Sequence, residues 1–274
     1  MQSTIREIGC RSILNRSRIP GIDYTVNPYV GCVHGCTYCY AQYMRFNQQI
    51  EQAWGSYCHV KINAASLFRK QILTAKPGLI SFSTATDPYQ TIEKKYCLTQ
   101  QMLNSLLTLP FSISMLTKSD LVLRDVELLQ KFPLERCEVG ISLNTSDDRI
   151  GRLFEPGAPA PSRRIEVLKS LHNSGIRTWV FLAPVLPVLT IDSIESFCSS
   201  IQNSVHTLLV DRLNVKYGIS GKMSSILKTH FPEHQEKWIE IYRDTKRRKD
   251  YYQQVFNQID ELGRSMGINV RFCS

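Results

Sequence analysis

The sequence lacks any long apolar run. No stretch of its 274 residues approaches the roughly eighteen uninterrupted apolar residues of a membrane-spanning helix. Residues 1–20 lack the apolar core and the small-residue cleavage site of a secretory signal. Internal repeats and low-complexity tracts are also missing. These absences predict a cytoplasmic globular protein with no membrane partner and with one sizeable core.

The sequence has fewer acidic than basic side chains. The chain has 24 aspartates and glutamates against 33 lysines and arginines, which gives a net charge of +9. The excess is visible at Arg6, Arg11, Arg16 and Arg18 and again in residues 243–252. A basic surface of this kind predicts a phosphate-rich or otherwise acidic partner, such as nucleic acid. The alternative is that these residues are only the solvated face of a helix.

Apolar, β-rich runs recur along the chain, and the segments between them have helical periodicity. The runs cover residues 79–84, 112–116, 138–143, 177–184 and 206–215, so that successive starts lie 26 to 39 residues apart. This spacing is the length of one strand and one helix, and a short strand at 28–31 brings the total to about six β–α units. Six units predict an α/β fold, a partial (β/α)6 barrel of the TIM type whose active face lies at the carboxyl ends of the strands.

The chain is expected to form one domain with two additions. We predict a basic N-terminal arm at 1–23, the barrel core at 24–220 and a helical extension at 221–274 that packs on the same domain. In the extension Tyr252, Val255 and Ile259 share one helical face, and residues 268–272 read as a last short strand. The extension would close the edge of the sheet or cover the site.

Nine cysteines are present, yet a fourth cysteine is missing from their one cluster. Cys32, Cys36 and Cys39 lie in "CVHGCTYC", and the remaining six are isolated. In a reducing compartment such clustering favours metal binding or catalysis over disulfides. A structural zinc site needs four ligands, and His34 lies between two cysteines of a very tight loop. A 4Fe–4S cluster held by three thiolates instead leaves one iron free to bind a small molecule.

The spacing Cys-x3-Cys-x-aromatic-Cys, with Tyr38 as the aromatic residue, resembles the cluster motif of radical S-adenosylmethionine (SAM) enzymes. Three more segments resemble the spore photoproduct lyase-like branch of that superfamily. They are "STATDPYQTIE" (83–93), "LTKSDLVLRD" (116–125) and "FEPGAPAPSRR" (154–164). The resemblance spans roughly residues 24–215 and implies the partial barrel typical of radical SAM enzymes.

The resemblance implies a definite chemistry. Cys32, Cys36 and Cys39 would bind three irons, and SAM would chelate the fourth. An electron from a reductant such as flavodoxin or ferredoxin would then cleave SAM to methionine and a 5′-deoxyadenosyl radical, which abstracts hydrogen from a substrate. The enzyme would be of the lyase or oxidoreductase type.

The resemblance also implies SAM contacts at several strand ends. Tyr38 would lie against adenine, Lys118 would pair with the carboxylate, and Ala183 would flank adenine. The turn after residues 79–84 would bind the amino group of SAM. Ser142, or Asn144 in its place, would contact the methionine part or the ribose. The complete set of predicted SAM contacts is Tyr38, Thr84, Thr86, Asp87, Lys118, Ser142, Asn144 and Ala183. Glu155, Arg163 and Arg164 would either reach the ribose or substrate or cap a helix that begins near Ser162.

One departure bears on the substrate. Photoproduct lyase uses a hydrogen-donor cysteine where this sequence has Thr84, whose O–H bond is far stronger than a thiol S–H bond. Tyr40 matches a tyrosine beside the lyase's cluster and is the candidate catalytic residue of a radical relay. If this protein also needs a hydrogen-donor thiol, then Cys58, Cys97 or Cys137 would have to supply it.

Three functions stay open at this point. The first is radical SAM chemistry on a nucleic acid, as in DNA repair or modification. The second is the same chemistry on a peptide or small metabolite. The third is a non-catalytic iron–sulfur protein that transfers electrons or binds a partner. The absence of a fourth cysteine argues against it, because an electron carrier normally closes its cluster with one.

Overall fold

An eight-stranded sheet forms the centre of the protein. The computed structural model describes residues 3–215 and 219–273. The strand order is β11-β10-β9-β8-β7-β6-β3-β2, and every neighbouring pair is parallel except β2 and β3. The strands are β2 (Asn15–Arg16), β3 (Tyr24–Val26), β6 (Leu79–Phe82), β7 (Ser112–Thr117), β8 (Cys137–Ser142), β9 (Arg177–Val185), β10 (Thr207–Arg212) and β11 (Val270–Phe272). The first and last strands do not pair, so the barrel is open, as the (β/α)6 prediction requires.

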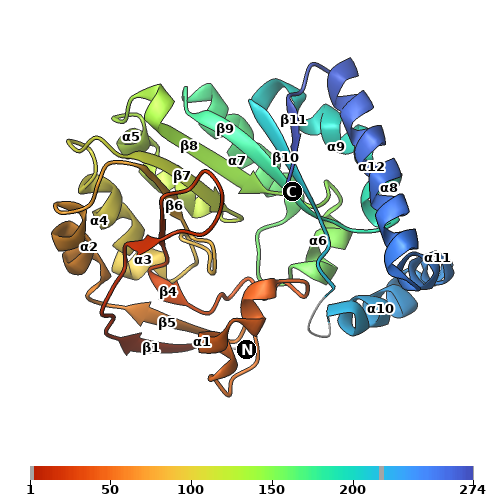
Figure 1. Ribbon diagram of the computed structural model, residues 1–274, viewed down its shortest axis with the longest axis horizontal. Helices are drawn as coiled ribbons and strands as arrows, with labels where there is room; N and C mark the ends of the chain where they lie inside the picture. The colour runs from red at the N-terminus through yellow and green to blue at the C-terminus, as the bar shows by residue number, and fades with distance from the viewer. Residues whose placement is uncertain (1–2, 216–218, 274) are drawn as a thin grey trace.

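A second, small sheet carries the chain into the cysteine loop. It consists of β1 (Thr4–Ile8), β5 (Tyr57–Lys61) and β4 (Tyr29–Val30), with β1 parallel and β4 antiparallel to β5. The strand predicted at 28–31 is therefore real but does not belong to the barrel. The first barrel strand is β3, whose Tyr24 and Val26 are buried and which pairs with β6. Figure 1 shows the small sheet below the left half of the main sheet.

Helices and helical turns fill the connections between the strands. The α-helices up to β10 are α1 (Arg45–Gln48), α2 (Ala64–Ile72), α3 (Glu93–Tyr96), α4 (Leu98–Asn104), α5 (Val126–Leu129), α6 (Asp148–Phe154), α7 (Pro161–Asn173), α8 (Leu189–Asp192) and α9 (Ile194–Ile201). The 3-10 turns are η1 (Tyr40–Tyr43), η2 (Asp120–Asp125), η3 (Leu134–Arg136) and η4 (Gln202–Ser204). The segment after β7 thus begins as η2 and becomes α-helical only at α5.

Helix α7 illustrates how the sequence sets local structure. Its buried face includes Val167, Leu168 and Leu171, which repeat at helical spacing. Pro161 occupies the first turn, where no backbone N–H donor is needed, and Gly175 follows the end with a φ of 74°. Ser162, predicted as the cap, is the second residue of the helix, and Ala160 occupies the cap position. Asp148 accepts hydrogen bonds from the backbone N–H and the hydroxyl of Ser162.

The C-terminal segment packs against the ends of β9 and β10. It forms α10 (Ile219–His230), α11 (Pro232–Tyr242), α12 (Thr245–Ser265) and β11. The Tyr251 hydroxyl accepts a hydrogen bond from the Val188 backbone at 2.8 Å, and Val188 has an unusual φ of 65°. The extension therefore supports the turn after β9. The predicted domain boundary at 220/221 stays a prediction, and residues 216–218 beside it lie outside the described residues.

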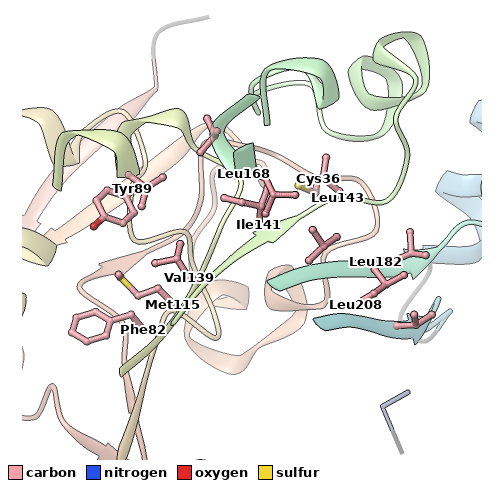
Figure 2. Packing of buried hydrophobic residues seen from close by; sticks show 14 of the residues in the cluster. Cys36, Phe82, Tyr89, Met115, Val139, Ile141, Leu143, Leu168, Leu182 and Leu208 are labelled. Atoms are coloured by element: carbon pink, nitrogen blue, oxygen red, sulfur yellow. The ribbon is translucent and has the colours of Figure 1, made fainter. Parts of the chain in front are cut away.

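Apolar side chains from both faces of the sheet form the core. Figure 2 shows Met115, Val139, Ile141 and Leu182 along neighbouring strands, with Cys36 among the residues drawn. Each of those four is completely or almost completely buried. No helix of the described residues is long and apolar enough to cross a membrane.

Gly140 on β8 gives a test of the sheet packing. It pairs in register with Trp179 on β9, and a Cβ at Gly140 would overlap the indole ring. We expect Gly140→Ala to lower the free energy of unfolding by about 1–3 kcal/mol through overpacking. Urea denaturation would measure this change in the free energy of unfolding. Gly221→Ala is the control, because nothing lies within 4 Å of its Cβ position and alanine favours a helix; equal stability of the two variants would contradict this account.

Candidate active site

The three clustered cysteines lie on one loop between β4 and η1. Cys32 and Cys36 are buried, and Cys39 is partly exposed. Burial raises the pKa of the Cys32 thiol, and the nearby Asp87 carboxylate and the Cys36 and Cys39 sulfurs raise it further. Burial also raises the pKa of Cys36 to about 12, although the Lys118 ammonium opposes the rise. The loop therefore gathers three mutually interacting thiols next to a cation.

Two polar side chains from the segment after β6 hold the start of this loop. The Gln90 side chain accepts a hydrogen bond from the Val33 N–H at 2.8 Å and donates one to the Gly31 carbonyl at 3.2 Å. Thr86 donates its hydroxyl to the same carbonyl at 2.6 Å. Gly31 has a φ of 84°, and a Cβ there would overlap the Tyr57 ring. The path of the loop thus depends on residues more than fifty positions away.

The predicted residue Asp87 also stabilises the loop. Its carboxylate accepts hydrogen bonds from the Thr117 hydroxyl at 2.7 Å and the Lys118 N–H at 2.8 Å, and His34 Nδ1 lies 3.4 Å away. Burial would raise the pKa of Asp87, but His34 and these donors lower it overall. With Tyr89 N–H also bonded, most acceptor positions of the carboxylate are occupied by the protein. These contacts favour a scaffold role for Asp87 over a direct cofactor contact.

Thr84 and Tyr40 lie together. Tyr40 donates its hydroxyl to the Thr84 carbonyl, while about half of the Tyr40 side chain remains exposed. Asn27 accepts hydrogen bonds from the backbone N–H groups of Thr84 and Ala85 at 3.1 and 2.9 Å. The structure thus joins the candidate relay residue to the position where the lyase-like donor was expected.

Four other predicted residues meet in one buried network. Lys118 donates to the Ser142 hydroxyl at 2.8 Å, and its ammonium lies 5.9 Å from the centre of the Tyr38 ring. Asn144 donates its side-chain amide to the Tyr38 hydroxyl at 3.2 Å. These residues come from the cysteine loop and from the carboxyl ends of β7 and β8, so the sheet register brings them together. Ala183 lies on β9, two residues beyond the register partner of Ser142, and no described polar contact links it to the network.

Two charged residues that the sequence left undecided complete this network. Glu155 accepts a hydrogen bond from Tyr38, forms an ion pair with Arg164 and lies 3.5 Å from the Lys118 ammonium. Arg164 also donates to the Ser142 carbonyl at 2.7 Å. The segment "FEPGAPAPSRR" contains both Glu155 and Arg164, but its sequence does not show that they would turn inward. Arg163, by contrast, pairs with Asp120 and Glu166 at the surface.

Two buried polar atoms at the strand ends have no hydrogen-bond partner among the described residues. They are the hydroxyl of Ser83, after β6, and the side-chain oxygen of Asn144, after β8. An unsatisfied buried polar atom costs about 1–3 kcal/mol. Ser83 also has a φ of 68°, a strained backbone conformation for a serine. Both features are expected of a site that binds a polar ligand, and only the structure identifies Ser83.

The thiols do not form a mononuclear metal site. Among the residues that the structure describes, no three His, Cys, Asp or Glu side chains are arranged to hold one ion. The more widely spaced ligands of a four-iron cluster do not require such convergence. Three clustered thiols beside a cation, with unsatisfied polar atoms at neighbouring strand ends, fit a cluster that binds a further polar molecule.

The three cysteines considered as hydrogen donors lie at different places in the fold, and Cys58 contacts the side chain of Gln90. Cys137 begins β8 at the end opposite Ser142, and Cys97 lies between α3 and α4, with its sulfur 3.7 Å from the Arg124 guanidinium. Cys58 is completely buried on β5. None of the three has a described contact with Thr84 or Tyr40.

Comparison with known proteins identifies relatives that match most or part of the chain. An uncharacterized protein of Methanocaldococcus jannaschii, MJ0683, is 33% identical over 255 residues and covers 93% of each chain. A Pseudomonas phage M6 protein described as a radical SAM Nalpha-GlyT isomerase is 29% identical over 172 residues, 61% of this chain and 34% of its own.

Solved structures share the fold. A spore photoproduct lyase complexed with a dinucleoside spore photoproduct superposes with a TM-score of 0.70 over 98% of this chain and 82% of its own, at 13% identity. The radical SAM superfamily model matches residues 26–201, more than half of the chain. The chain is therefore an enzyme of the radical SAM superfamily, whose cofactors are a 4Fe–4S cluster and SAM.

Proposed function

We propose that this enzyme cleaves SAM reductively at a cluster bound by Cys32, Cys36 and Cys39 and directs the resulting radical to a nucleic acid. The observation that carries the proposal is the loop of three thiols beside Lys118, with the unsatisfied Ser83 and Asn144 atoms nearby. When bound, the cluster and SAM supply one-electron cleavage of the sulfonium to methionine and a 5′-deoxyadenosyl radical.

The protein's own residues would bind SAM and orient it. Lys118 and Ser142 would hold the charged methionyl part of SAM, Tyr38 and Asn144 would contact the remainder, and Ser83 is added as a hydroxyl that has no protein partner. Thr86 and Asp87 would act by fixing the cysteine loop. Tyr40, bonded to Thr84, stays the proposed relay residue, and Ala183 the proposed neighbour of adenine.

A nucleic-acid substrate is supported by charge and by relatives. A related fold binds a dinucleoside spore photoproduct. Arg6, Arg11, Arg16 and Arg18 form no ion pair with a carboxylate of the described residues. In the run at 246–249, Arg247 pairs with Glu240 and Asp244. The N-terminal arginines are therefore available to pair with phosphates. The alternative of a peptide or small-metabolite substrate would leave these cations without a partner.

The cysteine variants test the chemistry. Cys36→Ala should lose the cluster's visible absorption after anaerobic reconstitution, and 5′-deoxyadenosine formation from SAM should fall to background, because a ligand is missing. Cys198→Ala, which removes a buried thiol on α9, is the control and should retain both. Cluster-loaded wild-type protein that produces no methionine or 5′-deoxyadenosine with a strong reductant would refute the proposed chemistry.

The loop scaffold gives another test. Gln90→Leu leaves the Val33 N–H and the Gly31 carbonyl with fewer partners, and we expect it to lower the free energy of unfolding by about 1–3 kcal/mol and to reduce the iron bound per chain. Iron analysis and denaturation would measure the two effects. Gln130→Leu, which loses one exposed hydrogen bond to the Ser174 carbonyl, should change neither appreciably.

Oligonucleotide binding across a salt series tests the substrate class. Replacing Arg11, Arg16 and Arg18 together by Gln should reduce the slope of log K against log salt by up to about 2–3, since each lost phosphate contact contributes roughly 0.7–0.9. The same replacement at Arg177, Arg247 and Arg264, each of which pairs with a carboxylate, should change the slope less. Salt-independent or undetectable binding by the wild type would favour the peptide or metabolite alternative.

A further inference from the structure

Glu155 lies at the centre of the buried network, and it is almost inaccessible to solvent. It accepts a hydrogen bond from Tyr38, pairs with Arg164 and lies 3.5 Å from Lys118. Three residues of three different elements, the cysteine loop, α7 and the end of β7, thus meet on one carboxylate. Lys118 in turn lies between Glu155 and the Ser142 hydroxyl.

A second buried triad in the same protein provides a comparison. Glu93 accepts a hydrogen bond from Tyr29 and pairs with Arg124, whose guanidinium lies 3.1 Å away. Tyrosine, glutamate and arginine therefore recur together, but the charges around them differ. Arg124 also pairs with a second carboxylate, Asp125, whereas the Glu155 triad has an additional cation, Lys118, close to Cys36.

The charges of the Glu155 network are unequal. Lys118 and Arg164 are cationic and Glu155 is the one carboxylate in contact with both. Burial lowers the pKa of Lys118, but the neighbouring Cys36 and Glu155 charges raise it, and the net effect is a rise. Burial raises the pKa of Glu155, but Arg164 and Lys118 lower it overall, so the three groups are charged together. Without Glu155, the two buried cations would lose the one carboxylate that contacts them both.

SAM itself is a cation. Its sulfonium and ammonium groups each carry a positive charge and its carboxylate one negative charge, so the molecule has a net charge of about +1. S-adenosylhomocysteine has almost the same shape but lacks the sulfonium charge. If the site contained the Lys118 and Arg164 charges without the Glu155 carboxylate, it would therefore repel the cation SAM more than it repels S-adenosylhomocysteine.

We propose that Glu155 is a positioning and specificity-determining residue, which holds Tyr38 and Lys118 at the cofactor site and supplies negative charge that allows this site to accept cationic SAM. This inference rests on the proposed function, in which Lys118 and Tyr38 contact SAM. It assigns the selectivity for the sulfonium to a residue that does not itself need to touch the cofactor.

The test compares the two ligands on one set of variants. Glu155→Gln keeps the shape of the side chain and removes its charge. We expect the dissociation constant of SAM to rise at least tenfold, a change of about 1.4 kcal/mol, and that of S-adenosylhomocysteine to rise by less than threefold. Equilibrium binding to anaerobically reconstituted protein, with iron content as the loading control, measures both without turnover.

Two matched variants separate charge from structure. Glu155→Asp keeps the charge but withdraws it from Tyr38 and Lys118, so both ligands should weaken by a similar factor. Glu93→Gln removes the carboxylate of the comparison triad and should lower the unfolding temperature without changing the ratio of the two dissociation constants.

Each outcome has a distinct meaning. Equal losses of both ligands in Glu155→Gln, or no loss of either, would overturn the proposal. If Glu155→Gln fails to assemble, an altered ratio in Glu155→Asp would overturn it instead. Failure of the cluster-loaded wild type to bind either ligand would count against the proposed function and not against Glu155 in particular.

Discussion

Burying Lys118 and Arg164 behind a loop of thiols requires a compensating negative charge, and much of the site follows from that requirement. A buried cation is tolerated only when it is paired and hydrogen-bonded. Glu155 meets this condition from the loop between α6 and α7, and Ser142 supplies its hydroxyl and carbonyl from the end of β8. Because the partners come from separate β–α units, the site exists only when the parallel strands are in their observed register.

The cysteine loop depends on its neighbours in the same way. It begins at the end of a two-residue strand and runs into a 3-10 turn, so regular secondary structure contributes little to its shape. Gln90 and Thr86 hold its start from one side. From the other side, Gly157 donates its N–H to the His34 carbonyl at 2.9 Å, in a contact so close that a Cβ would overlap the Val33 carbonyl. The C-terminal extension also reaches the loop, where Lys222 donates to Gln42 at 2.6 Å and Gln42 donates to the Cys39 carbonyl at 2.7 Å.

Periodicity predicted the barrel well, because buried strands and amphipathic helices must repeat their apolar residues at the spacing of the element. The five runs from residue 79 onward became β6 to β10 with small shifts at their ends. The run at 28–31 was assigned to the barrel, and its short apolar sequence is equally suited to the small sheet, where Tyr29 pairs with Val60. Pairing partners are not encoded in a two-residue strand. Within the basic run at 246–249, Arg247 pairs with Glu240 of α11 and with Asp244, the cap of α12, and the linear sequence does not show these pairings.

By itself, the sequence determined the chemistry of the cofactor, since the spacing of Cys32, Cys36 and Cys39 is a local property of eight residues. It also determined the β–α repeat, which depends on short-range periodicity. The tertiary structure alone decided which polar residues meet. It turned Glu155 and Arg164 inward, gave Thr86 and Asp87 protein partners, and left the Ser83 hydroxyl without one. The physical reason is that charge pairing and hydrogen-bond satisfaction join residues far apart in the chain, and a linear pattern contains no record of those distances.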